Sequence, residues 1–369
     1  MTQVPTVTID KLEARIRFHR EINTPLYIWG LPGTGKSQVI EQVGRKLAAE
    51  GGHDFNLVSA KEVPADPDNT FAVLDLRMSG VDAFDLKGAM VPDLENRILT
   101  FLKLGLLPDE KRHGKYGILL LDEYAEAELS TIKGSSSLIL DRKVSDNYFL
   151  PDGWLIVAAS NEPGVGGASA RKLPAHICNR FGHIRVEPSA KIWAEWLRSI
   201  GGSPILAAFI NGRPELINSW VKDAVAFSTP RSLANVNKVL QNVTEDRDLR
   251  ESLVAGFIGT GPANELEGFI TLFNSGQIPT WSSIRDNPTE AIVPHPGEKH
   301  ATSILFMAVS LISKNVTSVD EIPNVIAYIE RLPAELQDTA LLDIKTQQPD
   351  LLECRAVTAW RSRNPHAVI

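Results

Sequence analysis

The chain has 369 residues, which at about 150 residues per domain predicts two or three folded units. Its 43% hydrophobic, 22% charged and 7% aromatic residues are close to globular averages, so the composition excludes a disordered, collagen-like or low-complexity protein. The net charge of -7, from 38 basic and 45 acidic side chains, argues against a surface that coats duplex DNA, but it leaves room for a local basic channel.

Cysteines and long apolar runs are both scarce. Cys178 and Cys354 have no partner at the spacing of a metal site, and they do not make a disulfide framework. No run reaches the roughly 18 apolar residues of a membrane span, and charged residues from Asp10 to Glu21 replace the apolar stretch of a signal peptide. We therefore expect a cytoplasmic protein that has no membrane partner.

The first predicted element is a charged helix over residues 1–24. Asp10 and Glu13 have the spacing of a capping box, and the helix is expected to run to about Ile22 and to end before Pro25. Short apolar runs then alternate with helical patterns up to residue 187, which predicts a parallel sheet covered on both faces by helices. The expected strands are 26–29, 71–76, 118–121, 155–159 and 184–186.

One stretch of this region matches the phosphate-binding P-loop pattern in full, between an expected strand and an expected helix. It consists of Gly30, Leu31, Pro32, Gly33, Thr34, Gly35, Lys36 and Ser37. The glycines allow backbone N–H groups to point at phosphate oxygens, at the positive end of the helix dipole. Because that dipole disfavours Lys36 in the first turn unless an anion fills the loop, a nucleotide site is favoured over a glycine-rich turn.

The expected strand 118–121 ends in two carboxylates. We expect Asp122 to hold Mg²⁺, through water, beside the Ser37 hydroxyl, and Glu123 to polarise the attacking water. Phosphoryl transfer needs this neutralisation of charge and an oriented nucleophile. A buried strand that ends in acidic residues is common, so the interpretation depends on the P-loop. The predicted cofactors are ATP and Mg²⁺.

Three further polar residues are candidates for the same site. Asn161 follows the strand 155–159, where its amide can orient the hydrolytic water, although an asparagine there often only starts a turn. Arg180 follows a short expected helix, where an arginine usually complements the dipole. Arg231 lies in the first turn of a helix that Thr229 caps and Pro230 begins, so an anion such as a γ-phosphate would explain its position.

This series of motifs resembles an AAA+ ATPase over about residues 25–245, and the stretches 140–144, 150–154 and 158–161 resemble its MoxR group. The resemblance implies a Walker A motif at 30–37, a Walker B motif at 118–123, sensor 1 at Asn161, an arginine finger at Arg180 and sensor 2 at Arg231. It also implies a hexameric ring in which the finger reaches the neighbour's nucleotide. A remodelled protein client and a partner with a von Willebrand A domain are further expectations from the family.

The expected fold class is α/β, with a P-loop NTPase core of the AAA+ type followed by an α-helical lid and a helical C-terminal region. The expected domains are the N-terminal helix at 1–24, the nucleotide-binding domain at 25–187, the lid at 188–245 and the C-terminal domain at 246–369. The resemblance places a helix-2 insert at 85–92 and a second hairpin at 144–150. Neither shows the aromatic, hydrophobic and glycine triplet of threading unfoldases, so processive threading is not expected, and both could be plain surface loops.

Two other functions compete with a remodelling ATPase that acts as a chaperone. A nucleic-acid motor or loader is disfavoured by the acidic balance and by the lack of a strong basic run beyond the mixed 111–115. A nucleotide-gated scaffold without turnover is disfavoured by the presence of all the predicted catalytic residues. GTP specificity is also disfavoured, because 237–240 lacks the aspartate of the motif that reads guanine.

Overall fold

The computed structural model describes residues 4–101, 105–144, 148–164, 170–221, 224–274, 278–295, 297 and 301–366. The chain divides into two compact units. One is Met1–Pro188 with Trp220–Asp223, and the other is Ser189–Ser219 with Ala224–Ile369. The first unit contains the strands of the main sheet, and the second is helical.

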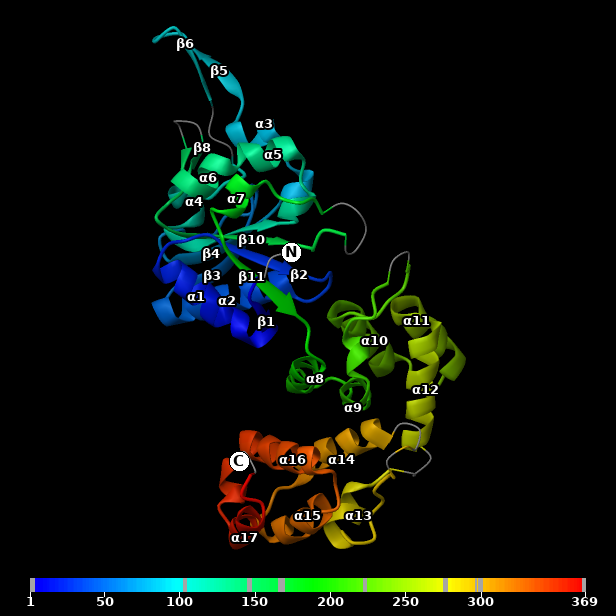
Figure 1. The fold of residues 1–369 in the computed structure, drawn as a ribbon. Coiled ribbons are helices and arrows are strands. Elements are labelled where there is room, and N and C mark those ends of the chain that lie inside the picture. The colour runs from blue at the N-terminus through cyan, green and yellow to red at the C-terminus, as the bar shows by residue number, and fades with distance from the viewer. Residues whose placement is uncertain are drawn as a thin grey trace. The chain divides into compact units, whose positions relative to one another are not determined.

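The main sheet has seven parallel strands in the order β1-β11-β2-β10-β7-β4-β3 (Figure 1). They are β1 (Thr6–Thr8), β2 (Leu26–Gly30), β3 (Asp54–Val58), β4 (Thr70–Arg77), β7 (Tyr116–Asp122), β10 (Gly153–Ser160) and β11 (Gly182–Glu187). The five strands expected from apolar runs are all present, and each is longer than expected. β1 and β3 were missed because the first is only 3 residues long and the second has polar residues that break its apolar pattern.

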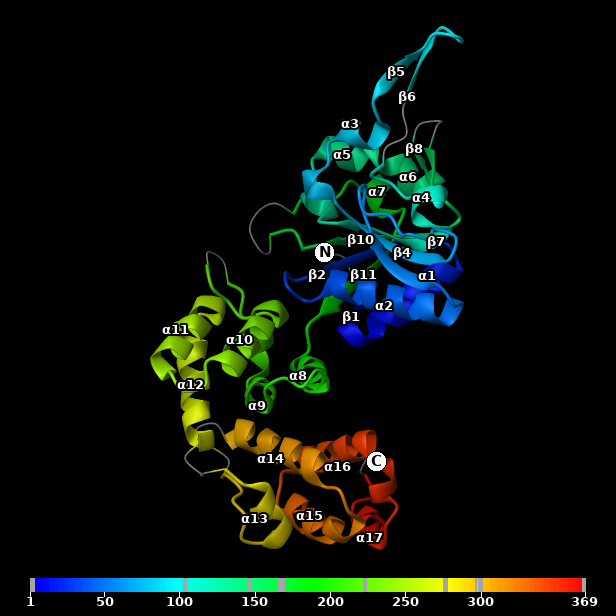
Figure 2. The same ribbon diagram turned by 180° about the vertical axis from the view of Figure 1, so that it is seen from behind.

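Helices cover both faces of this sheet (Figure 2). One face packs on α1 (Leu12–Glu21) and α2 (Lys36–Gly51), in a core that includes Ile28 and Ile118. The other face packs its Tyr27 and Leu119 against a second group of helices, since successive strand residues point to opposite faces. That group includes α3 (Ala83–Lys87), α5 (Leu129–Gly134), α6 (Ser136–Asp141) and α7 (Ala175–Cys178), and α4 (Glu110–His113) precedes β7. The predicted α/β fold class, a P-loop core followed by helices, is confirmed.

The register of the central strands brings the predicted site residues to one edge of the sheet. Trp29 of β2 pairs with Ser160 of β10, and Leu121 of β7 pairs with Ala158 of β10. The chain leaves these strands at the P-loop, at Asn161 and at Asp122, so the three segments begin side by side. This edge is the carboxyl end of the parallel strands, where open α/β sheets bind their ligands.

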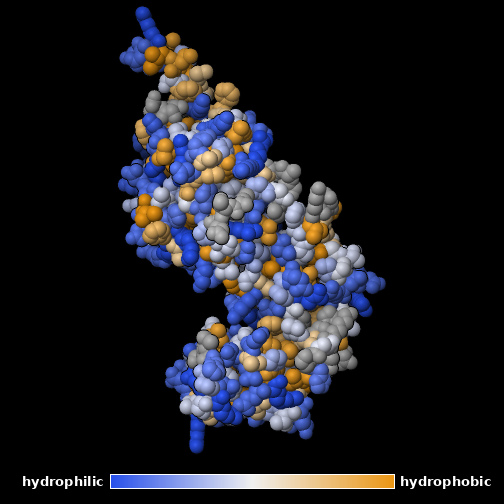
Figure 3. All heavy atoms as spheres, in the orientation of Figure 1, coloured by the Kyte–Doolittle hydropathy of each residue, from blue (hydrophilic) through white to orange (hydrophobic). Residues whose placement is uncertain are grey.

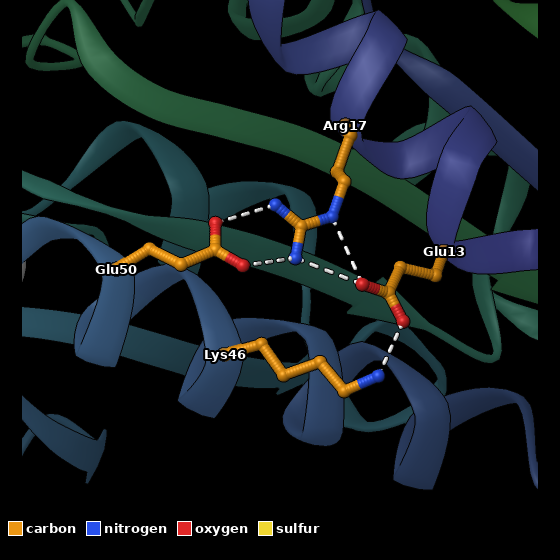
Figure 4. Close-up of polar contacts among 4 residues, drawn as sticks. All are labelled: Glu13, Arg17, Lys46 and Glu50. Carbon is orange, nitrogen blue, oxygen red and sulfur yellow. Dashed lines mark hydrogen bonds and ion pairs between the residues drawn. The ribbon is translucent and has the colours of Figure 1, made fainter.

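Four charged side chains join α1 to α2 (Figure 4). Arg17 donates to Glu13 at 2.8 Å and to Glu50 at 2.6 Å, while Lys46 donates to Glu13 at 2.6 Å. The hydrogen bonds from Lys46 and Arg17 lower the pKa of Glu13. Single exposed ion pairs contribute little, but a network with a shared carboxylate holds helices together better than one pair does. It fixes α1 against the helix that begins at the P-loop.

The predicted capping box of α1 is wrong. The helix begins at Leu12, after a 3-10 turn over Ile9–Lys11, and the Asp10 carboxylate accepts a hydrogen bond from the Thr8 hydroxyl instead. Asp10 lies inside the 3-10 turn and the N-cap of α1 is Lys11, so the Glu13 carboxylate bonds Arg17 and Lys46 and takes no part in a capping box. Long-range ion pairing replaced the local cap that the sequence spacing indicated.

Two antiparallel hairpins extend from the first unit. β5 (Met90–Asp93) pairs with β6 (Ile98–Phe101) after α3; the helix-2 insert expected at 85–92 overlaps the end of α3 and the start of β5, and the hairpin extends beyond it. β8 (Lys143–Val144) pairs with β9 (Tyr148–Phe149) where the second hairpin was expected, and residues 145–147 of that prediction lie outside the described residues. The β5–β6 hairpin projects well beyond the body of the first unit in both ribbon views (Figures 1 and 2).

The second unit contains helices built around two cores, and its described residues include no strand. Its α-helices are α8 (Ala190–Ser199), α9 (Pro204–Gly212), α10 (Pro230–Asn242), α11 (Arg247–Ile258), α12 (Thr260–Asn274), α13 (Trp281–Asp286), α14 (Ala301–Asn315), α15 (Ile322–Ile329), α16 (Ala334–Gln347) and α17 (Arg355–Arg363). Leu233 of α10 and Val254 of α11 belong to the same core, which therefore continues across the boundary predicted at residue 245. Within the described parts of the chain, no helix has the length and apolar character needed to cross a membrane.

Candidate nucleotide site

The P-loop backbone takes conformations that only glycine adopts without strain. Gly33 has φ 71° and Gly35 has φ 88°, both in the left-handed region. A Cβ atom at Gly30 would lie 2.9 Å from the carbonyl oxygen of Val186, so the end of β2 also requires glycine. Gly35 is the N-cap of α2 and offers no side chain to bond the first N–H groups of the helix. The start of α2 is therefore built for an external acceptor such as phosphate.

Lys36 is buried at the mouth of this loop. Its Nζ donates to the carbonyl oxygens of Gly30 and Leu31, both at 3.0 Å, and to Oδ1 of Asn161 at 3.4 Å. These contacts bring the P-loop lysine and Asn161 together, and the strand before Asn161 pairs with the P-loop strand, as the sequence predicted. These three acceptors are neutral oxygens, and a charged phosphate oxygen is a stronger hydrogen-bond acceptor than any of them.

Ser37 and Asp122 lie in direct contact across the loop. The Ser37 hydroxyl donates to Oδ2 of Asp122 at 2.8 Å, and Oδ1 of Asp122 accepts the backbone N–H of Glu123 at 2.9 Å. A hydroxyl and one carboxylate are hard oxygen donors of the kind that Mg²⁺ uses together with phosphates and water. Among the residues described, no group of three or more His, Cys, Asp or Glu could hold a metal alone. The pair therefore fits a magnesium ion that arrives with a nucleotide.

Glu123 bonds to a serine outside the P-loop. Its φ of 53° is in the left-handed region, which is strained for a residue with a side chain, and its Oε2 accepts the Ser79 hydroxyl. Ser79 lies in the 3-10 turn Met78–Gly80 that follows β4, 44 residues before Glu123. Sequence reasoning missed Ser79, because nothing near it in the chain marks a serine in a turn as a partner of the Walker B motif.

Asn161 has a second partner that the sequence did not reveal. Its Nδ2 donates to Oε1 of Glu126 at 2.8 Å, while its Oδ1 faces Lys36. Glu126 ends the 3-10 turn Tyr124–Glu126, which follows directly on the Walker B carboxylates. Burial raises the pKa of Glu126, and the Asn161 hydrogen bond opposes that rise. The sequence did not predict Glu126, because the pattern indicates as catalytic only the carboxylates directly at the end of the strand.

A third carboxylate lies near Asp122. Asp75 of β4 follows Phe71 and Val73 at alternate positions, so it points to the face of the sheet that carries α2. The side chain as a whole is exposed, yet neighbouring protein atoms keep part of the water from its carboxyl group. This partial burial, together with the charge of Asp122, raises the pKa of Asp75 to about 6. A strand-interior aspartate at this edge adds negative potential beside the Ser37 and Asp122 pair.

The two predicted arginines are placed differently. Arg180 follows α7, as expected, and its Nη1 donates to the backbone carbonyl and the hydroxyl of Ser136 in α6. Arg231 lies in the second unit, exposed, in the first turn of α10. Among the hydrogen bonds of the described residues within the first unit, none joins Arg180 to the P-loop, Asp122 or Asn161. The structure brings together Lys36, Ser37, Asp122 and Asn161, while the roles of both arginines stay predictions. Thr229 caps α10 as expected.

Comparison with known proteins gives the following. No family model and no curated protein matches the sequence. Solved structures that align include NtrX from Brucella abortus, with 12% identity over 98% of this chain and 69% of that chain, at a TM-score of 0.39. A RuvB variant from Thermotoga maritima has 15% identity, coverages of 76% and 75% and a TM-score of 0.36. A DNA polymerase III gamma subunit-related protein from Thermotoga maritima has 8% identity, coverages of 96% and 97% and a TM-score of 0.35. Such scores carry no argument for function, which depends here on the strand order and the side chains of the site.

Proposed function

We propose that the chain is an ATP-hydrolysing ring ATPase of the AAA+ class and MoxR type, which remodels or activates a protein client. One observation carries the proposal: two hydrogen-bonded pairs, Lys36 with Asn161 and Ser37 with Asp122, join the P-loop to the ends of two neighbouring strands. A P-loop that contacts a strand-end carboxylate and a strand-end amide is equipped for phosphoryl transfer to water.

In the proposed reaction a water oxygen attacks the γ-phosphorus of ATP, the bond to the oxygen bridging the β and γ phosphorus atoms breaks, and ADP and phosphate leave. Bound Mg²⁺ would supply neutralisation of phosphate charge. Lys36 and the N–H groups at the start of α2 bind the phosphate oxygens, while Ser37, and Asp122 through water, would hold the metal. Glu123 takes the proton of the attacking water through its carboxylate, of which Oε2 accepts the Ser79 hydroxyl in this structure. Asn161 orients that water through its amide.

The position of Arg180 supports a site that is completed by assembly. In its own chain the guanidinium contacts Ser136 of α6, and not the P-loop. An arginine that neutralises the charge of a γ-phosphate must lie close to that phosphate. Arg180 would therefore act on the nucleotide bound by a second copy of the chain. A closed homo-oligomer, with six copies as in the family, would give every site one such arginine.

The β5–β6 hairpin supports a protein client over a nucleic acid. Met90, Leu94, Ile98 and Leu99 are 61%, 84%, 57% and 66% exposed, and apolar residues gather on this projection (Figure 3). An exposed apolar cluster of this kind marks a protein contact, whereas nucleic acid needs basic side chains. The von Willebrand A-domain partner is carried over from the resemblance and belongs to the same proposal.

The test compares ATP hydrolysis by the wild-type chain with that by Glu123→Gln. We expect the variant to bind ATP with Mg²⁺ and to turn it over at least about 10²-fold more slowly, which is the scale of a positioned general base. Glu62→Gln, at an exposed carboxylate away from the site, is the matched control and should leave the rate unchanged. Turnover of Glu123→Gln near the wild-type rate would contradict the assignment.

Mixing variants tests the ring. Arg180→Ala should bind ATP and hydrolyse it poorly, because arginine fingers contribute about 10³ to 10⁵ in turnover. Arg180→Ala subunits keep Glu123, and Glu123→Gln subunits keep Arg180, so some interfaces of a mixed ring hold both. Activity should partly return on co-assembly. No recovery in rings shown to contain both subunits would count against a finger that acts on the neighbour.

A further inference from the structure

Glu126 lies where it can control the Asn161 side chain. Asn161 has one amide, with a donating nitrogen and an accepting oxygen, and the two ends face different partners. Nδ2 donates to Oε1 of Glu126 at 2.8 Å, and Oδ1 accepts from Nζ of Lys36 at 3.4 Å. A carboxylate can only accept hydrogen bonds, so an ionised Glu126 selects the orientation in which nitrogen faces it and oxygen faces the P-loop.

The turn that carries Glu126 is fixed to the strand that carries Asn161. The backbone N–H of Ala125 donates to the Ser160 hydroxyl at 2.7 Å, and that hydroxyl also bonds the Tyr27 hydroxyl of β2 at 2.7 Å. On its other side the carbonyl oxygen of Ala125 accepts the backbone N–H of Arg171 at 2.7 Å. The backbone beside Glu126 is therefore bonded to β10 and to Arg171, and the Glu126 carboxylate extends from this anchored turn to the Asn161 amide.

We propose that Glu126 is a positioning residue for hydrolysis, because it fixes the Asn161 amide with its oxygen toward the reacting phosphate and water. An accepting oxygen at that point can take a hydrogen bond from the attacking water and hold its lone pair toward phosphorus. The reversed amide would present N–H groups, which would compete with Lys36 for the phosphate oxygens and leave the water without that acceptor. The inference rests on the proposed function and assigns a residue that the motif pattern does not contain.

The experiment measures kcat, KM and ADP affinity for Glu126→Ala, Glu126→Gln, Asn161→Ala and the double variant Glu126→Ala with Asn161→Ala. Glu126→Ala should lower kcat about tenfold, the equivalent of one lost hydrogen bond of typical strength. ADP affinity and KM should stay within about threefold, because the change acts on the transition state and not on nucleotide binding. Glu128→Ala, in an exposed ion pair with Arg171, is the control and should match the wild type.

Two results separate positioning from a merely structural role. Glu126→Gln keeps an oxygen that can accept from Nδ2, so it should recover most of the lost rate. In the double-mutant cycle, the double variant should have the same kcat as Asn161→Ala alone, because Glu126 acts on the reaction only through the Asn161 amide. The inference would be overturned if the reductions in kcat of the two single variants multiply in the double variant. It would also be overturned if Glu126→Gln is as slow as Glu126→Ala.

The same measurements distinguish failure of the inference from failure of the proposed function. If the wild type hydrolyses ATP and Glu126→Ala keeps its rate, only the positioning role of Glu126 is wrong. If the wild type does not hydrolyse ATP, and if Lys36→Ala binds nucleotide as tightly as the wild type, both the proposed function and the role of Glu126 are overturned. A thermal unfolding midpoint that falls in Glu126→Ala but not in Glu126→Gln, with kcat unchanged in both, would assign Glu126 to stability alone and also overturn the inference.

Discussion

Helices α2 and α10 both carry a cation in the first turn, and the structure treats the two differently. The N-cap of α2 is Gly35, which has no side chain to offer, and Lys36 is buried against loop carbonyls. The N-cap of α10 is Thr229, whose hydroxyl accepts a hydrogen bond from the backbone N–H of Ser232 at 3.1 Å. The backbone N–H of Thr229 in turn donates to the Ser232 hydroxyl at 2.8 Å. Arg231 beside that cap is exposed.

This difference separates two ways in which a helix start can meet a phosphate. The open start of α2 offers backbone N–H groups as well as a charge, because no side chain has satisfied them. The start of α10 already uses its capping box, so it can contribute only the guanidinium of Arg231. A cation in a first turn is therefore a weaker sign of a binding site when a cap is present, and the four predictions below follow from that contrast.

The largest effect is expected at α2. Lys36→Ala should abolish measurable ATP binding in calorimetry, because the loop loses the charge that balances the β and γ phosphates. Lys46→Ala removes a lysine from the same helix, where it bonds Glu13 on the surface, and should keep wild-type affinity. Unchanged ATP affinity in Lys36→Ala would contradict the assignment of this loop as the phosphate-binding site.

The next effect is on the cap of α10. Thr229→Ala should lower the free energy of unfolding by about 0.5 to 2 kcal/mol, since the Ser232 N–H loses its acceptor. The measurement is urea unfolding of the protein without nucleotide. Thr339→Ala, at a threonine that bonds the Glu335 carbonyl within a helix, is a control that changes the same atoms without touching a cap. Equal losses in the two variants would mean that the cap does not distinguish α10.

The third effect concerns the negative side of the α2 site. The native pKa of Asp75, about 6, lies above its ordinary value of 3.8, so between these values the folded state binds more protons and stability falls as pH rises. Asp75→Asn removes that loss. The free energy of unfolding of Asp75→Asn, measured relative to that of the wild type, should therefore be higher at pH 8 than at pH 4. The difference should be no more than about 1 kcal/mol, because the Asp75 side chain is exposed to solvent.

Urea unfolding at the two pH values measures this difference. Asp66→Asn, at an exposed aspartate outside the site, serves as the control and should show a smaller pH dependence. A gain in Asp75→Asn that is the same at pH 4 and pH 8 would contradict the raised pKa of Asp75 itself, since burial and the charge of Asp122 both act only on the ionised carboxylate.

The sequence was sufficient for the parts of the site that are local in the chain. Asp122 ends β7, Asn161 follows β10, and Lys36 and Ser37 begin the helix after the loop that leaves β2, so strand order brings these segments together. Ser79, Glu126 and Asp75 could not be found in this way, because each becomes relevant through a neighbour that only the folded register supplies. The same reason explains the missed capping of α1, where a contact from α2 took the place of the local partner.

The smallest effect should come from Arg231→Ala. Without nucleotide, removal of a cation from a helix start should be neutral or slightly stabilising, by a few tenths of a kcal/mol, because the positive end of the dipole disfavours it. With ATP bound the same change should cost stability, if the guanidinium meets the γ-phosphate. Thermal unfolding of the Glu123→Gln background, with and without ATP, isolates this difference because hydrolysis is blocked. Lys238→Ala, near the middle of α10 and exposed, should show no dependence on nucleotide. If Arg231→Ala destabilises the protein equally in both states, the arginine is structural, and α10 has no part in sensing the nucleotide.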